Sequence, residues 1–327
     1  NKGCPVLYKL MQIKSSILIL LLICVFSFSC KKRQAFNNED GQSSVDVITS
    51  QSENGDVMSD VNMAIGDQGI LRGKSGTIAQ SLGVFPSPCD LKVDTLEIVR
   101  GILKLNYTGV VCKNRKREGT VLITTLNYPL KKWKNKGCVL TIQYLNYKVT
   151  NTNSGKTVSI KGTINLTNEN GGTWYDLWFT SLPSLVYTMS ANDLQFTFDG
   201  NTTLHSISRK LTYTYKSNGK ITTCVIEGVG TRDGKNNVDG WGQNRDGDSY
   251  VSQITTPIKW STNCGTSAPI EGVLRVKVDK KEFELVSNFA VDQNGNDVTD
   301  NINQCPYGWK LSWTYKKKTN TRIFPYN

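Results

Sequence analysis

From about Cys89 onward, apolar and polar residues alternate in short runs. The apolar residues that share a face in four such runs are Leu140, Ile142 and Tyr144; Leu211, Tyr213 and Tyr215; Leu274, Val276 and Val278; and Trp309, Leu311, Trp313 and Tyr315. A repeat of two residues is typical of a strand with one buried and one solvated face. No long helical repeat appears in this region, so the pattern predicts an antiparallel β-sheet.

Turn signals separate these runs at hairpin spacing. They include Asn153-Ser154-Gly155-Lys156, Asp199-Gly200, Asn218-Gly219, Asp246-Gly247 and Asn294-Gly295. Asn-Gly and Asp-Gly pairs tolerate the positive φ of the tight turns that join paired strands. We therefore predict an all-β fold, in which a meander of roughly ten to fourteen strands forms a sandwich or a partly closed barrel, because a twisted open sheet of that size is uncommon.

The N-terminal region has a different pattern. Lys14 precedes an apolar run from Ile17 to Phe26, which is followed by Ser27-Phe28-Ser29-Cys30 and the basic Lys31-Lys32-Arg33. A basic segment, a short apolar segment and a small residue before cysteine predict a lipoprotein signal peptide over residues 11–29, with Cys30 as the acylated residue. An ordinary cleaved signal or an uncleaved anchor is the alternative.

Composition divides the rest of the chain. Residues 1–10, ahead of the first methionine, are expected to be upstream translation. Residues 30–80 are rich in Ser, Asn, Gln, Asp and Gly, which predicts a lipidated cysteine followed by a flexible tether. Residues 81–327 are expected to form the antiparallel β-domain, with 31 bases and 20 acids.

That excess of bases favours anionic partners, either an acidic glycan or lipopolysaccharide, and we expect no nucleic acid. The basic runs Lys113 to Arg117, Lys131 to Lys136 and Lys316 to Lys318 would suit phosphates. They equally fit turns and strand edges, where lysines discourage aggregation of sheets. Solvated lysines on polar strand faces are therefore the alternative interpretation.

Six cysteines fall in the predicted β-domain: Cys89, Cys112, Cys138, Cys224, Cys264 and Cys305. An even number in an exported protein suggests disulfides, although sequence alone allows fifteen pairings. We predict Cys89 with Cys112 and Cys264 with Cys305, which leaves the other two as a third bridge or as buried thiols. Metal ligation is disfavoured because the chain has no C-x-x-C pair and a single histidine.

One polar cluster is a candidate ligand site. It contains Trp241 with Asp239, Asn244, Asp246 and Asp248, flanked by Asp233 and Asn236. Its oxygen donors are dense enough to consider calcium, but the spacing does not match an EF-hand, so we expect no cofactor. An exposed Trp241 would stack on sugar rings, and so would Trp174, Tyr175 and Trp178, although most aromatic residues are expected in the core. Ordinary hairpin loops explain the cluster equally well.

Hydrolytic chemistry would need other groups. His205 is the one imidazole, and it lies in a strand-like run without a nucleophile-elbow motif. Glu227, Asp239 and Asp246 are the carboxylates that would form a glycosidase pair. We expect a strand-face histidine and no enzymatic activity.

The succession of motifs resembles a set of Bacteroidota envelope lipoproteins of unknown function. It includes the segments 112–123, 146–163, 218–222 and 242–264, and the resemblance covers about half of the chain, from Cys89 to Leu274. The resemblance implies an envelope β-protein and carries no activity.

We therefore predict an outer-membrane lipoprotein, anchored by its N-terminal lipid, with a non-catalytic binding or structural role among envelope proteins. The basic Lys31-Lys32-Arg33 favours the periplasmic face over the cell surface. A surface glycan-binding lipoprotein of a polysaccharide-uptake system is the alternative function, followed by a hydrolase.

Overall fold

The computed structural model describes residues 41–68, 88–217, 221–265, 268–279, 281, 284–298, 304–315 and 318–326. The chain from Gly41 to Asn327 forms one compact unit. The predicted signal peptide and the predicted acylation site Cys30 lie outside the described residues.

The all-β prediction is confirmed, because the described strands join in one 15-stranded sheet in which every pairing is antiparallel. The strands are β1 (Leu91–Asp94), β2 (Ile102–Cys112), β3 (Arg115–Thr125), β4 (Cys138–Asn151), β5 (Thr157–Asn168), β6 (Leu185–Phe198), β7 (Asn201–Lys216), β8 (Ile221–Gly228), β9 (Gly230–Arg232), β10 (Lys235–Gln243), β11 (Ser249–Ser261), β12 (Glu271–Val278), β13 (Glu284–Val291), β14 (Gly308–Tyr315) and β15 (Lys318–Pro325). The helices are α2 (Gln42–Asp67), the short α3 (Trp174–Phe179) and the 3-10 turn η1 (Ile98–Arg100).

The sheet is a meander with a closed section at its centre. Strands β1 to β7 pair in sequence order, and β10 to β15 continue the sheet from β7. Strand β8 forms a hairpin with β7 and also pairs with β11. The four strands β7, β10, β11 and β8 therefore form a closed ring of paired strands. A partly closed barrel within a larger sheet is therefore the form that the predicted meander takes.

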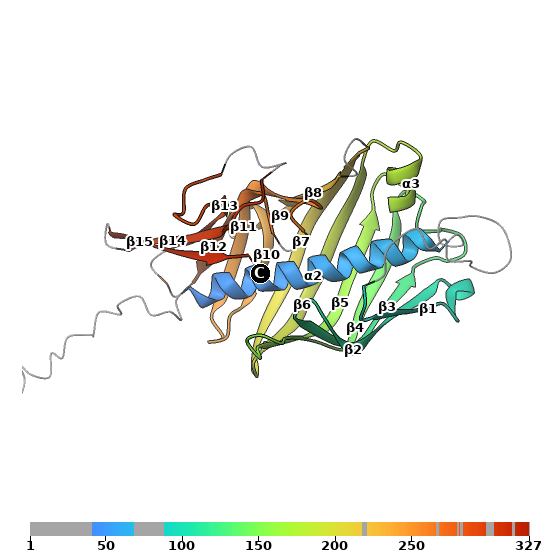
Figure 1. Cartoon of the computed structure of the whole chain (residues 1–327), viewed down its shortest axis with the longest axis horizontal. Helices are drawn as coiled ribbons and strands as arrows, with labels where there is room; N and C mark the ends of the chain where they lie inside the picture. Colours follow the sequence, from blue (N-terminus) through green and yellow to red (C-terminus); the bar gives the residue numbers. More distant parts are fainter. Residues whose placement is uncertain are drawn as a thin grey trace, which may run out of the picture. The chain divides into compact units, whose positions relative to one another are not determined.

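The predicted tether over residues 30–80 is wrong in its central part. Residues 42–67 form the 26-residue helix α2, which runs across the strands in Figure 1 and has no exposed residue among those whose burial is described. The composition of this segment predicts solvent-exposed polar side chains, but in the structure the sheet provides hydrogen-bond partners for them. The helix also contributes a core face, with Val57, Val61 and Ile65 fully buried. The folded domain consequently begins near Gly41, well before residue 81.

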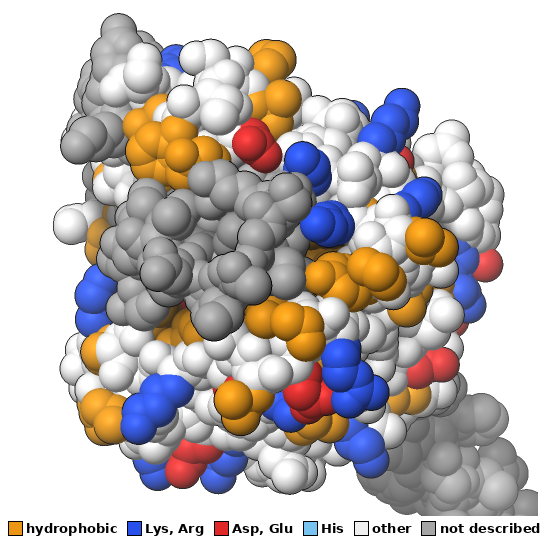
Figure 2. Space-filling model, turned by 90° about the vertical axis from the view of Figure 1, so that its right-hand side faces the viewer, with side chains coloured by type: hydrophobic (Ala, Val, Ile, Leu, Met, Phe, Trp, Pro, Cys, Tyr) orange, Lys and Arg blue, Asp and Glu red, His pale blue; other side chains and the backbone are white. Residues whose placement is uncertain are grey.

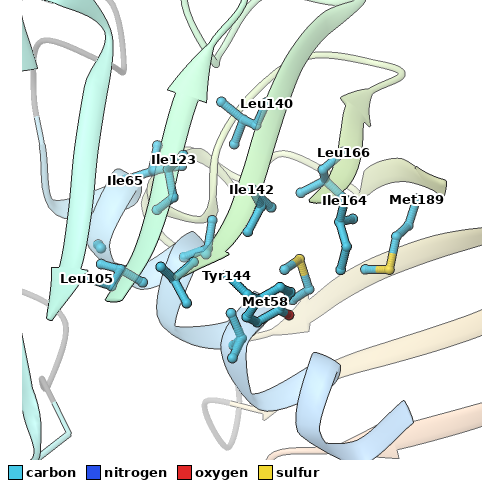
Figure 3. Close-up of a cluster of buried hydrophobic side chains, with 14 of the residues drawn as sticks. Met58, Ile65, Leu105, Ile123, Leu140, Ile142, Tyr144, Ile164, Leu166 and Met189 are labelled. Atoms are coloured by element: carbon cyan, nitrogen blue, oxygen red, sulfur yellow. The ribbon is translucent and has the colours of Figure 1, made fainter. Parts of the chain in front are cut away.

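The core between α2 and the sheet is apolar. Figure 3 shows Met58 and Ile65 of α2 facing side chains from five strands, namely Leu105, Ile123, Leu140, Ile142, Tyr144, Ile164, Leu166 and Met189. Three of these residues, Leu140, Ile142 and Tyr144, are on the strand face that the alternating pattern predicts to be buried. Burial of this apolar surface is the main force that holds α2 to the sheet.

The predicted turns and disulfides agree with the structure where it describes them. Asn153 to Lys156 lies between β4 and β5, and Asp246-Gly247 lies between β10 and β11. Disulfides join Cys89 to Cys112, with 6.0 Å between the Cα atoms, and Cys264 to Cys305, with 5.3 Å. The remaining two cysteines, Cys138 and Cys224, are free thiols.

Across the described residues, no helix is both long and apolar enough to cross a membrane.

Candidate functional site

Polar side chains along α2 form hydrogen bonds with successive parts of the sheet. From the C-terminal to the N-terminal part of the helix, the pairs are Asp60 with Tyr107 and Arg117, Glu53 and Asp56 with Arg115, Asn54 with Tyr144, Gln51 with Asp239, Ser50 with His205, Asp46 with Arg245, and Ser44 with Ser287. Residues 42–67 contain five acids and no base, whereas their charged partners on the sheet are mostly arginines. Electrostatic complementarity therefore fixes the position of α2 in addition to apolar packing.

The most enclosed of these ionic groups centres on Arg117 of β3. Its guanidinium donates to Asp60 at 2.7 Å and, through two nitrogens, to Asp90 at 2.7 Å each. Burial raises the pKa of Asp60, and the charge of Arg117 opposes that rise. Burial by itself would lower the pKa of Arg117. Hydrogen bonding to Asp90 and the charge of Asp60 outweigh this effect and hold the pKa above its usual value. The group is satisfied internally, which is typical of a structural ion cluster.

A second group lies beside it on the same strand. Arg115 donates to Asp56 and, at 2.6 Å, to Glu53. Burial raises the pKa of Glu53 to about 7, although Arg115 favours the charged form. These carboxylates face an arginine between helix and sheet and are not arranged around an open cleft.

An apolar pocket opens between α2, α3 and the closed section of the sheet. The space inside it that can hold another molecule has a volume of about 80 Å³. Its wall consists of Gln51, Gly55 and Ser59 from α2, Trp174 from α3, and Leu211, Tyr213, Thr222, Cys224, Ile226, Trp260, Ser261, Thr262 and Gly265. A mainly apolar wall with a few polar groups is typical of small-molecule sites.

The polar atoms of this pocket wall are few, and some have no partner. Trp174 Nε1, Trp260 Nε1 and Thr222 Oγ1 are buried without a hydrogen-bond partner among the residues that the structure describes. These atoms are enclosed by protein, so they do not offer hydrogen bonds to a molecule in the open pocket. The accessible wall therefore suits a largely apolar molecule.

Cys224 does not give the pocket a reactive group. Burial raises the pKa of its thiol to about 12, and a hydrogen bond with Tyr213 lowers it only partly. A protonated thiol is a weak nucleophile and packs as a small apolar group. Cys224 therefore acts as part of the apolar wall.

The predicted strand position of His205 is confirmed, and the residue is buried on β7 beneath α2. Its Nδ1 lies 2.5 Å from the hydroxyl of Tyr250, and its Nε2 lies 2.9 Å from Thr203 Oγ1 and 3.4 Å from Ser50 Oγ. Burial lowers its pKa to about 3, with a further contribution from Arg209. No carboxylate is among these hydrogen-bond partners, and the imidazole is only 5% exposed. The arrangement is a neutral hydrogen-bond junction and lacks the geometry of a Ser-His-Asp site.

The three carboxylates considered for a glycosidase are in different environments. Asp239 is fully buried and accepts hydrogen bonds from Arg209 and Gln51. Glu227 pairs with Lys210 at 2.9 Å on the exposed side of the sheet. Asp246 is exposed in the turn between β10 and β11. They have separate partners, so the structure does not assemble the carboxylate pair.

The candidate ligand cluster around Trp241 is also divided. Asp239 is beneath α2, whereas Asn244 accepts the backbone N–H groups of Asp246 and Asp248 and so stabilises the turn. Trp241 is half-buried, and the guanidinium of Arg232 lies 5.2 Å from its ring centroid. An aromatic face covered by an arginine is not an open platform for sugars, and the turn geometry accounts for Asn244.

Within the described part of the chain, no group of three or more His, Cys, Asp or Glu side chains could hold a metal ion. The apolar pocket was not predicted from the sequence. Its residues come from segments far apart in the chain, and the only local signal is the Trp174 to Trp178 aromatic run, which we considered for sugar binding.

No family model, no curated protein and no solved structure matches the chain. The resemblance to Bacteroidota envelope lipoproteins consequently stays a prediction.

Proposed function

We propose that this protein is a non-catalytic binding protein of the cell envelope, whose ligand is an apolar molecule, such as a fatty acid. The observation that carries the proposal is the pocket between α2, α3 and the closed section of the sheet, with a volume of about 80 Å³ and a mainly apolar wall. The end of an acyl chain would bury against Leu211 and Ile226.

The environment of the ionisable groups supports a non-catalytic role. The thiol of Cys224 and the imidazole of His205 have pKa values that keep them neutral near pH 7. The buried carboxylates Asp60 and Asp239 pair with arginines. Groups in these states stabilise the fold and do not transfer protons to a bound molecule.

Placement in the envelope rests on the sequence and on the disulfides. The two predicted disulfides, Cys89 with Cys112 and Cys264 with Cys305, are present, and such bonds persist in oxidising compartments. The proposal keeps the predicted acylation of Cys30 and the periplasmic face of the outer membrane.

Gly55 provides the test. It lies in the pocket wall on α2, and a Cβ at this position would meet no atom within 4 Å. Gly55→Ala therefore adds one methyl group without a clash and is the matched control, while the larger side chain of Gly55→Leu is designed to take up space in the pocket. Binding of a dansyl-labelled fatty acid, followed by fluorescence titration and oleate competition, would weaken about tenfold or more in Gly55→Leu and remain near the original affinity in Gly55→Ala. Equal binding by both variants, each folded by circular dichroism, would refute the pocket as the site.

A further inference from the structure

Large hydrophobic side chains are exposed where neighbouring strands are connected at one end of the sheet. The connections are η1 between β1 and β2, residues 126–137 between β3 and β4, and α3 between β5 and β6. Of the ten large hydrophobic residues that are exposed in the described part of the chain, five lie here: Leu96, Val99, Leu126, Leu130 and Phe179. The extreme cases are Leu130, which is 91% exposed, and Leu96, which is 89% exposed. Single exposed leucines are ordinary, but a group at one edge indicates an interaction surface.

The three segments at this edge are joined by backbone hydrogen bonds. Thr125 N donates to Gly101 O at 2.9 Å, which links the end of β3 to η1. Gly172 N donates to Lys134 O at 2.8 Å, which links the β3–β4 connection to the segment before α3. The segments that carry the exposed side chains are therefore joined to one another, and we call these segments together the apolar edge.

The β3–β4 connection is also anchored in the core. Trp133, three residues beyond Leu130, is only 1% exposed, and its ring centroid lies 5.1 Å from that of Tyr187. Asn168 Nδ2 donates to Trp133 O at 2.8 Å. Because the buried Trp133 anchors the β3–β4 connection in the core, Leu130 is exposed on a well-packed segment.

Basic residues surround these apolar side chains. The connection contains Lys131, Lys132, Lys134 and Lys136 and has no acid. The nearest acid of η1, Glu97, already pairs with Arg100 at 3.1 Å and Lys104 at 2.7 Å. Figure 2, which views the end of the molecule where β1 and α3 lie, shows hydrophobic side chains with Lys and Arg side chains between them and a smaller number of Asp and Glu side chains.

We infer that the apolar edge docks on an anionic lipid bilayer, with Leu130 and its neighbours entering the interface and the lysines contacting lipid phosphates. Apolar side chains with basic neighbours are the combination that binds anionic membrane surfaces. A protein partner would also accept apolar contacts, but the β3–β4 connection has four lysines and no acid, and the carboxylate of Asp176 in α3 is held by Thr173, which favours a surface of uniform negative charge. This inference goes beyond the ligand pocket and does not depend on it.

The test places an environment-sensitive probe at the apolar edge. The full chain carrying Leu130→Cys is labelled with the fluorophore NBD and mixed with vesicles of phosphatidylglycerol and phosphatidylcholine. Val110→Cys at the far end of β2, where Val110 is 53% exposed, is the matched control, and the unsubstituted protein controls for labelling of the free thiols. We expect a blue shift of NBD at position 130 and quenching by brominated lipids, with neither effect at position 110.

Charge is tested in the same assay. Lys131→Glu/Lys134→Glu should remove the shift at position 130, whereas Lys113→Glu at the far end should not. Vesicles of phosphatidylcholine alone should give a smaller shift. A probe at position 130 that stays in water, equal quenching at positions 110 and 130, or equal shifts in both vesicle types would overturn the inference. Fatty-acid binding measured without vesicles would be unaffected by any of these outcomes.

Discussion

Arg117 on β3 and Asp60 on α2 form an ion pair, with 2.7 Å between Nη1 and Oδ2, inside the domain. The side chains are 9% and 5% exposed. This contact joins a strand of the sheet to a segment whose composition is typical of a solvated tether. It shows that the acids of this segment are matched by arginines of the sheet, which adds to the apolar burial that holds α2 in place.

We predict that Arg117→Ala strongly destabilises the protein. The substitution leaves Asp60 and Asp90 buried without their cation, which costs about 3–5 kcal/mol in the free energy of unfolding. Urea unfolding at pH 7 measures the loss. Lys210→Ala is the control, because its pair with Glu227 is about 40% exposed and such surface pairs contribute about 1 kcal/mol or less. Similar losses in the two variants would contradict the structural role of the Arg117 cluster.

The sheet could be predicted from the sequence because alternation is a local signal. Leu274, Val276 and Val278 are buried on one face as the period of two requires. The two predicted disulfides are confirmed, although sequence alone could not exclude other pairings.

The helix α2 could not be predicted from composition because its partners are distant in the sequence. Asp46 pairs with Arg245, and Gln51 with Asp239, across roughly 190–200 residues. A local signal exists in Val57, Met58, Val61, Ala64 and Ile65, which repeat at helical spacing. The residues of the candidate ligand cluster around Trp241 are not brought together. Residues 239–248 are close in sequence, but the alternation of the strand and the turn after it direct their side chains into different environments.

We predict that two buried groups have opposite effects on the pH dependence of stability. The pKa of His205 is lowered from 6.5 to about 3, so the unfolded chain takes up its proton first and stability falls as the pH falls below 6.5. The pKa of Glu53 is raised from 4.5 to about 7, so the folded chain retains its proton longer and stability falls as the pH rises from 4.5 to 7. The two contributions oppose each other between pH 4.5 and 6.5.

Single substitutions should separate these contributions. Urea unfolding of Glu53→Gln between pH 4.5 and 6.5 should show stability rising with pH by up to about 1.4 kcal/mol per unit relative to the unsubstituted protein. His205→Gln should show the opposite trend relative to the same reference. Parallel pH profiles for all three proteins would count against the assigned environments of both groups.

We also predict that each disulfide stabilises the domain. The bonds close loops of 23 and 41 residues, and the corresponding loop entropy is about 3–4 kcal/mol for each bond. Cys264→Ser/Cys305→Ser should therefore lower the free energy of unfolding by that amount under non-reducing conditions, and reductant should have less effect on this variant than on the parent. An unchanged urea midpoint would show that the bond does not constrain the unfolded chain.

The most direct measurement of the central claim is native mass spectrometry of the full chain purified from envelope membranes. The account predicts a bound apolar molecule on the parent protein and on Gly55→Ala, and its loss from Gly55→Leu, in which the larger side chain takes up space in the pocket. Identical spectra for the two Gly55 variants, whether both bare or both loaded, would contradict the assignment of this pocket as the binding site.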